Sequence, residues 1–120
     1  MVDEITLTLP RQADYQTVAH LVLGGLATRL DLTLEHLEDL QLALGAVLAH
    51  GDDAGSEVTL RLRIDHTALE AVIEPVGQRL LDSVEQESDE LGLRRILEST
   101  VDDFQVDGDS VRLTKRVVHA

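Results

Sequence analysis

The chain has 120 residues, of which 43% are hydrophobic. This length and composition suit one globular domain with a real core and exclude wholesale disorder. The formal net charge of -13 argues against binding to nucleic acid or to an anionic membrane, because both would repel the chain, and it favours a basic protein partner.

The sequence also limits the compartment and the covalent chemistry. It contains no cysteine, which excludes disulfides, thiol catalysis and Cys-type zinc sites. No apolar run is long enough to cross a membrane, and the start lacks the pattern of a signal peptide. We therefore expect a cytoplasmic protein. No repeat or linker divides the chain, so we expect residues 1–120 to form a single domain.

The first part of the chain predicts a strand followed by a long helix. Apolar residues alternate with threonines from Ile5 to Leu9, and Pro10 ends the strand. A helical apolar period then runs from Ala13 to Leu30. Gly24 and Gly25 lie inside this helix, where each costs up to about 1 kcal/mol relative to Ala. We expect such a pair to mark close packing against another element.

The stretch from Glu35 to Gly51 predicts a second helix, around which the other elements are organised. Thr33 suits its N-cap, with His36 where a capping box would have Glu. Gly51 is a suitable stop. Its apolar residues recur at steps of three and four and form a broad stripe: Leu37, Leu40, Ala43, Leu44, Val47 and Leu48.

The second half predicts two hairpins separated by helices. Val58–Ile64 alternates cleanly, and Leu69–Ile73 returns as its partner. Residues 78–84 suggest a short helix, residues 85–90 an acidic loop and residues 91–101 a helix. A strand starts at Phe104, and an Asp-Gly-Asp turn at residues 107–109 leads into the last strand. There we expect Val111, Leu113, Lys115 and Val117 to alternate outward.

Two stretches resemble the GHKL ATPase family, and most closely its serine-kinase anti-sigma factors. The family's first box reads roughly D-L-x-L-A-V-S-E-A-x-x-N, and Asp39–Leu44 fits its opening. The segment from Leu91 to Lys115 is similar to the end of the domain. The resemblance implies a GHKL (Bergerat-like) α/β (α+β) two-layer sandwich, with helices on one face of a mixed, mostly antiparallel sheet.

The residues that should hold ATP and magnesium are altered in the first box. In active relatives this helix supplies a catalytic Glu and a magnesium-binding Asn. The matching positions here are Ala46 and His50. Ala46 cannot accept a proton, and magnesium prefers oxygen ligands to imidazole.

The other two boxes are also degenerate. The second, D-x-G-x-G, reads the adenine and falls on residues 74–78. Either Glu74 takes the Asp position, or Gly77 is retained and Pro75 takes it. In the third box, G-x-G-L, Gly92 is retained but Glu90 replaces the first glycine. A carboxylate at that position would face the phosphates, which need free backbone N–H groups.

We interpret the chain as a regulatory protein-binding domain resembling an anti-sigma factor. We expect its kinase activity to be lost, its ATP binding to be weak or absent, and no catalytic residue or cofactor to be present. The resemblance implies a sigma factor or an antagonist-like protein as partner, and a possible homodimer. Two alternatives stay open. One is an active ATP-dependent serine protein kinase with a displaced active site, using Glu38, Asp39 or Glu74. The other is an unrelated interaction domain of the same class, or a structural subunit.

The sequence favours neither a metal site nor a hydrolase site. His50, His66 and His119 have no paired spacing such as H-x-x-x-H, so the sequence predicts no metal site. A Ser-His-Asp hydrolase is not expected either, because no G-x-S-x-G elbow is present.

Overall fold

The computed structural model describes residues 3–30, 32–50, 55–65, 67–77, 80, 82 and 92–116. The predicted short helix at 78–84 and acidic loop at 85–90 fall largely outside this part. The element order is β1 (Asp3–Pro10), α1 (Ala13–Leu30), α2 (Leu34–His50), β2 (Glu57–Ile64), β3 (Ala68–Glu74), α4 (Leu93–Thr100), β4 (Asp103–Asp107) and β5 (Ser110–Arg116).

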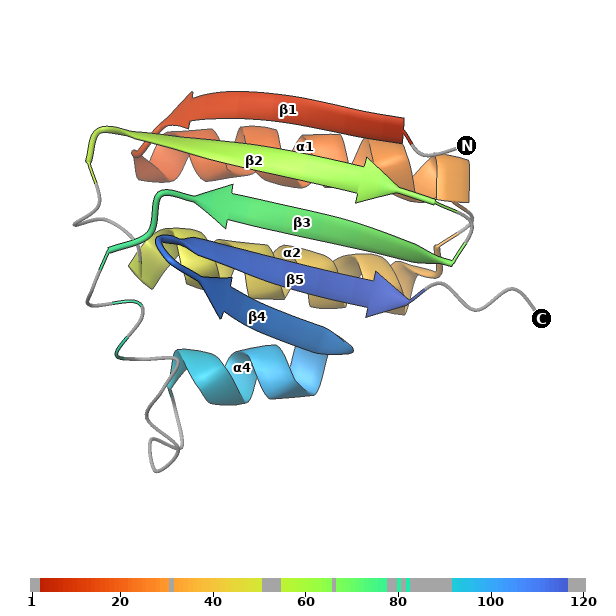
Figure 1. Cartoon of the computed structure of the whole chain (residues 1–120). Helices are drawn as coiled ribbons and strands as arrows, with labels where there is room; N and C mark the ends of the chain where they lie inside the picture. Colours follow the sequence, from red (N-terminus) through yellow and green to blue (C-terminus); the bar gives the residue numbers. More distant parts are fainter. Residues whose placement is uncertain are drawn as a thin grey trace.

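The strands form one five-stranded sheet in the order β1-β2-β3-β5-β4. Helices α1 and α2 lie behind this sheet, and α4 lies beside α2 near the β4 edge (Figure 1). The predicted two-layer sandwich is therefore confirmed. The predicted hairpin of Val58–Ile64 with Leu69–Ile73 is also confirmed, since β2 pairs antiparallel with β3. The pairs among the described strands are all antiparallel.

The two faces of the sheet differ because side chains alternate along each strand. The face toward the helices is apolar and includes Leu60, Leu62, Leu69 and Ile73. None of the described helices covers the opposite face, which we call the open face, and cross-strand ion pairs occupy it. Arg61 pairs with Glu74 at 3.1 Å, Arg63 with Glu4 at 3.8 Å, and Arg112 with Glu70 at 3.4 Å. This open face is thus charged and suited to water.

The helices pack by the apolar stripes that the sequence predicts. Thr33 caps α2 as expected, since its hydroxyl oxygen accepts a hydrogen bond from the His36 N–H at 3.1 Å. Leu40, Leu44 and Val47 of α2 are almost completely buried. Leu93 and Leu97 lie one turn apart on α4, and both are buried. The core is therefore aliphatic and lies between the sheet and the helices.

The expectation for the glycine pair in α1 is wrong. A Cβ atom added to Gly24 or Gly25 would meet nothing within 4 Å. The reason is that α1 packs through Ala19, Leu23 and Leu26, and the two glycines lie away from that side. The close approach between the two long helices occurs instead at Gly45, where an added Cβ would lie 3.4 Å from His20 Nε2.

The expected orientation of the last strand is also wrong. Val111, Leu113 and Lys115 point inward and are buried, whereas Arg112 and Arg116 lie on the open face. Burial of the two apolar side chains sets this register, because a shift by one residue would expose both. Lys115 shares their side of the strand and is accommodated by polar partners, described below.

Candidate functional site

The described residues of the three altered boxes lie at one end of the sheet. Helix α2 ends there, β3 ends there and α4 begins there, at the left of Figure 1. Helix α4 packs against α2. The topology therefore brings together the regions that the family resemblance identifies, although they are far apart in the sequence.

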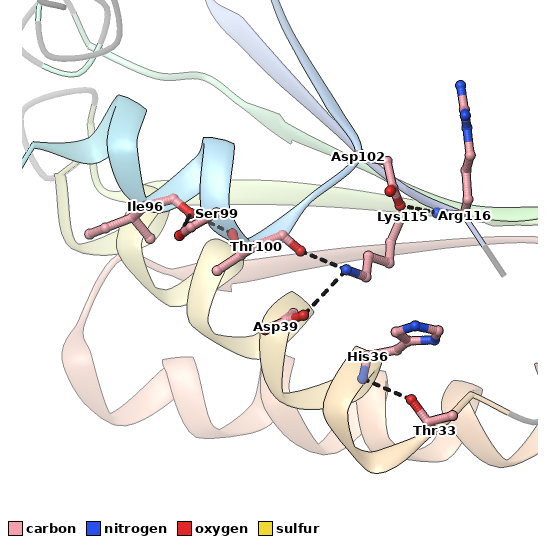
Figure 2. Close-up of polar contacts among 9 residues, drawn as sticks. All are labelled: Thr33, His36, Asp39, Ile96, Ser99, Thr100, Asp102, Lys115 and Arg116. Carbon is pink, nitrogen blue, oxygen red and sulfur yellow. Dashed lines mark hydrogen bonds and ion pairs between the residues drawn. The ribbon is translucent and has the colours of Figure 1, made fainter. Parts of the chain in front are cut away.

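Ala46 presents only a methyl group where the resemblance implies a catalytic base. It is partly buried and packs against the hydrophobic core. Ala46 follows Asp39 by seven residues, which is about two helical turns, so the two share one side of α2. Asp39 reaches toward the end of α4 (Figure 2). The backbone of α2 extends to His50, but the His50 side chain lies outside the described part.

Glu74 is directed away from the helical layer. It follows the buried Ile73 and therefore lies on the open face of the sheet. Its Oε1 lies 3.1 Å from Arg61 Nη2 in an ion pair, and both side chains are partly exposed. The structure thus places this carboxylate in a surface ion pair on the side of the sheet opposite α2 and α4.

The residues after Glu74 are held closely against the fold. The Pro75 carbonyl oxygen accepts a hydrogen bond from Arg11 Nη2 at 2.7 Å. The Val76 N–H donates to the Asp109 carbonyl oxygen at 2.6 Å. The Val76 side chain is only 5% exposed and belongs to the hydrophobic core. Gly77 follows it and is partly buried. A buried apolar side chain therefore stands inside the second box.

Gly92 is the N-cap of α4 and is buried. Its backbone is extended, with φ of -74° and ψ of 163°, which any L residue adopts. Its carbonyl oxygen accepts hydrogen bonds from the N–H groups of Arg95 and Ile96, at 3.2 and 3.3 Å. Glu90, the other residue of this box, lies outside the described part of the chain.

Sequence reasoning missed the polar link between the sheet and the helices, which is made by Lys115 of β5. Its Nζ donates to the Thr100 carbonyl oxygen at 2.9 Å and to Asp39 Oδ2 at 3.3 Å, as Figure 2 shows. Lys115 thereby links β5 to α2 and to the last residue of α4. One feature of the sequence could have indicated this contact, namely that the only lysine lies on the same side of its strand as Val111 and Leu113. The carboxylate that it contacts, Asp39, belongs to the first box.

Comparison with known proteins finds serine-protein kinases named RsbW among the relatives of the chain. No protein-family model matches the chain. It is 27% identical over 97 residues to serine-protein kinase RsbW of Bacillus velezensis, and 27% identical over 96 residues to RsbW of Bacillus subtilis. It is 32% identical over 84 residues to RsbW of Listeria monocytogenes. The chain is similar to the RsbW kinases. These relatives support the resemblance to the serine-kinase anti-sigma factors.

The RsbW matches cover part of each protein. They span 76%, 75% and 64% of this chain, in the same order. They span 59% of each Bacillus RsbW and 53% of the Listeria RsbW. The chain thus spans little more than half the length of the RsbW proteins that it matches.

The described residues show neither a metal site nor a membrane-spanning helix. Within the described residues, no group of three or more His, Asp or Glu side chains is arranged to hold a metal ion. His66 and His119 lie outside that part. None of the described helices is both long enough and apolar enough to cross a membrane.

Proposed function

We propose that the chain is a regulatory protein-binding domain of the anti-sigma type, in which phosphoryl transfer has been lost. The observation that carries this proposal is the direction of Glu74. In active relatives the carboxylate of the second box reads the adenine, but here Glu74 pairs with Arg61 on the open face. The RsbW similarity supports the relationship to anti-sigma kinases, and the altered boxes support the loss of chemistry.

The other described positions point the same way. Ala46 offers no group that accepts a proton, and a positioned general base typically contributes about 10²–10⁴-fold to a rate. The side chain of Val76, a residue of the second box, is buried. The residues that the structure describes do not fit a bound ATP–magnesium complex of the family type. We therefore infer that ATP binds weakly or not at all.

An active kinase with a displaced site is the second candidate, and the name of the RsbW relatives favours it. Three carboxylates were available to replace the missing base. Two of them are already engaged, since Glu74 pairs with Arg61 and Asp39 with Lys115. Glu38 is exposed and lies eight residues before Ala46, which is roughly 12 Å along the helix axis at 1.5 Å per residue. This geometry argues against simple replacement.

Calorimetric titration with ATP and magnesium separates the two candidates. We expect no saturable heat at micromolar nucleotide. A dissociation constant in the low micromolar range would contradict the loss of binding and would favour the displaced site. Incubation with labelled ATP and candidate antagonist proteins should likewise transfer no phosphate.

The expected partner is a sigma factor or an antagonist-like protein, and a homodimer is the assembly that the resemblance suggests. Affinity capture from the source cell, followed by identification of the bound proteins, tests the partner class. Enrichment of a sigma factor or of an antagonist-like protein, repeated with purified components, is the supporting result. Failure of every purified sigma factor and antagonist of that cell to bind would contradict the proposal.

A further inference from the structure

We propose that the outer surface of helices α1 and α2 is a docking surface for a basic amphipathic helix of a partner protein. We define this surface by three exposed leucines, Leu21 of α1 and Leu34 and Leu42 of α2. The two helices lie side by side behind the sheet (Figure 1), so one side of each faces away from the core. The inference rests on the proposed protein-binding function and names the kind of segment that this surface would hold.

The three leucines are the most exposed large apolar side chains in the part of the chain that the structure describes. Their exposed fractions are 71% for Leu21, 70% for Leu34 and 56% for Leu42, and the next highest is 40%, for Val106. Single exposed apolar residues are common on protein surfaces. Several on one surface indicate a place where another molecule removes them from water.

A contact between the helices brings Leu21 and Leu42 close together on this surface. Gln41 Nε2 donates to the His20 carbonyl oxygen at 3.2 Å. Leu21 and Leu42 are the next residues along their helices, and both are exposed. Leu34 precedes Leu42 by eight residues, which is roughly 12 Å along the axis of α2. The three leucines thus extend over a length of roughly two turns of a docked helix.

Gly24 and Gly25 leave α1 without side chains one turn after Leu21. Each glycine weakens the helix relative to Ala, and a Cβ atom added at either position would meet nothing within 4 Å. Packing inside the described part of the chain therefore does not explain the pair. A docked helix does, because glycine allows another backbone to approach closely.

The charges beside the leucines indicate the sign of the partner. Glu38 lies one turn from both Leu34 and Leu42, so its carboxylate stands between them. Glu38 and the neighbouring Glu35 are exposed, and neither side chain is in an ion pair with a described residue. Arg29, the exposed cation at the end of α1, is already engaged. The surface therefore offers free carboxylates around an apolar centre.

Charge complementarity favours a basic helix over a second copy of this chain. A second copy would bring the same carboxylates and the same net charge of -13. A helix with apolar residues at steps of three and four would cover the leucines. Lysine or arginine beside that stripe would reach Glu35 and Glu38, so the surface commits to a partner helix of this composition.

Two synthetic peptides of about 14 residues, or roughly four helical turns, test the surface. One contains only leucine and lysine, with leucine at steps of three and four, and the other has glutamate in place of each lysine. Each is titrated into the full chain at about 0.15 M salt, which screens distant charges. Backbone amide signals are followed by NMR. We expect saturable shifts with the lysine peptide, centred on residues 21–25 and 34–42. The glutamate peptide should bind at least about tenfold more weakly.

Substitutions of exposed residues locate the binding. Leu21→Gln combined with Leu42→Gln should weaken the lysine peptide at least about tenfold. The control is Val106→Thr, which removes exposed apolar surface from the β4 edge and should leave binding unchanged. If the double variant fails to fold, Leu42→Gln alone should still weaken binding.

The carboxylate has its own matched pair of variants. Glu38→Gln should weaken the lysine peptide, because the charge beside the leucines is lost. Glu57→Gln makes the same change at an exposed position on β2 and should leave binding within about twofold. Gly25→Gln adds a long side chain where α1 is bare, so it should weaken binding in a chain that stays folded.

Four results would overturn the proposal. They are the absence of saturable shifts with the lysine peptide, equal affinity for the two peptides, binding that survives in the folded double variant, and equal effects of Glu38→Gln and Glu57→Gln. Shifts of the same amides that grow with chain concentration, without peptide, would assign the surface to a second copy and contradict the proposal as well. Binding of purified sigma factors is measured separately, so failure of this surface is distinguishable from failure of the proposed function.

Discussion

Lys115 Nζ lies 2.9 Å from the carbonyl oxygen of Thr100, the last residue of α4. This carbonyl belongs to the final turn of the helix, where no amide of the helix itself is available as a donor. A cation at that end also opposes the negative end of the helix dipole. The same ammonium group reaches Asp39 on α2. One side chain thus fixes the end of α4 against both the sheet and α2.

Replacing Lys115 with Met should lower the free energy of unfolding by about 1–3 kcal/mol, because the Thr100 carbonyl and Asp39 lose a charged donor. Urea denaturation measures the change. Arg63→Met is the matched control, since its pair with Glu4 is longer, at 3.8 Å, and exposed; we expect less than about 1 kcal/mol there. A Lys115→Met chain as stable as the unsubstituted one would show that methionine packing replaces the polar link fully.

Substituting Gly24 or Gly25 with Ala should raise the free energy of unfolding by up to about 1 kcal/mol each, because Ala has the higher helix propensity. Nothing lies within 4 Å of the added methyl group at either position. Gly108→Ala is the contrasting case: its φ of +61° is unfavourable for Ala, so this variant should be destabilised. Thermal melts followed by circular dichroism compare the three. A loss of stability at Gly24 or Gly25 would contradict the open surroundings of these two positions.

Thr33→Ala should cost about 1 kcal/mol of stability, since the hydroxyl that caps α2 is removed. The appropriate comparison is Thr28→Ala. The Thr28 hydroxyl donates to the Gly25 carbonyl inside α1 at 2.7 Å, and such bonds back to the preceding turn do not stabilise a helix. We expect Thr28→Ala to be neutral within about 0.5 kcal/mol. Equal losses for the two variants in urea denaturation would argue against a capping role for Thr33.

Glu74→Ala tests the two candidate functions directly. If Glu74 is only the partner of Arg61 in a surface ion pair, its removal should cost no more than about 1 kcal/mol of stability. It should also leave any residual ATP binding unchanged. In an active kinase, Glu74 would contact the adenine, and the same change would remove binding. Calorimetry with ATP and magnesium on both chains distinguishes the outcomes, with denaturation as the check on folding.

Much of the fold was predictable because strand and helix periods differ clearly in this sequence. Val58–Ile64 alternates strictly, and the structure gives it the predicted partner. The stripe in α2 was equally clear, and its observed bounds, Leu34–His50, differ by one residue at each end from the predicted stretch. The agreement arises because each strand or helix must bury one face, so the spacing of its apolar residues reveals its secondary structure. The tertiary contacts need not be known for this prediction.

The failures have equally physical causes. The surroundings of Gly24 and Gly25 depend on how α1 rotates about its axis, and two adjacent glycines do not fix that rotation. The position of Lys115 depended on partners from two helices, which no local pattern reveals. The direction of Glu74 was set by strand register, since it is one residue past the buried Ile73. The box alignment could name that residue but could not orient it.

Lys115 is the only lysine in the chain, and its side chain is 11% exposed with its amine engaged by two acceptors. Acylation requires the free, unprotonated amine as the nucleophile that attacks the reagent, so this residue should react slowly while α4 is in place. Its acetylation would then proceed through openings that release the end of α4. The rate at which the peptide that contains Lys115 gains the mass of an acetyl group would report the rate of those openings. No engineered probe is needed, because the natural sequence has this one lysine.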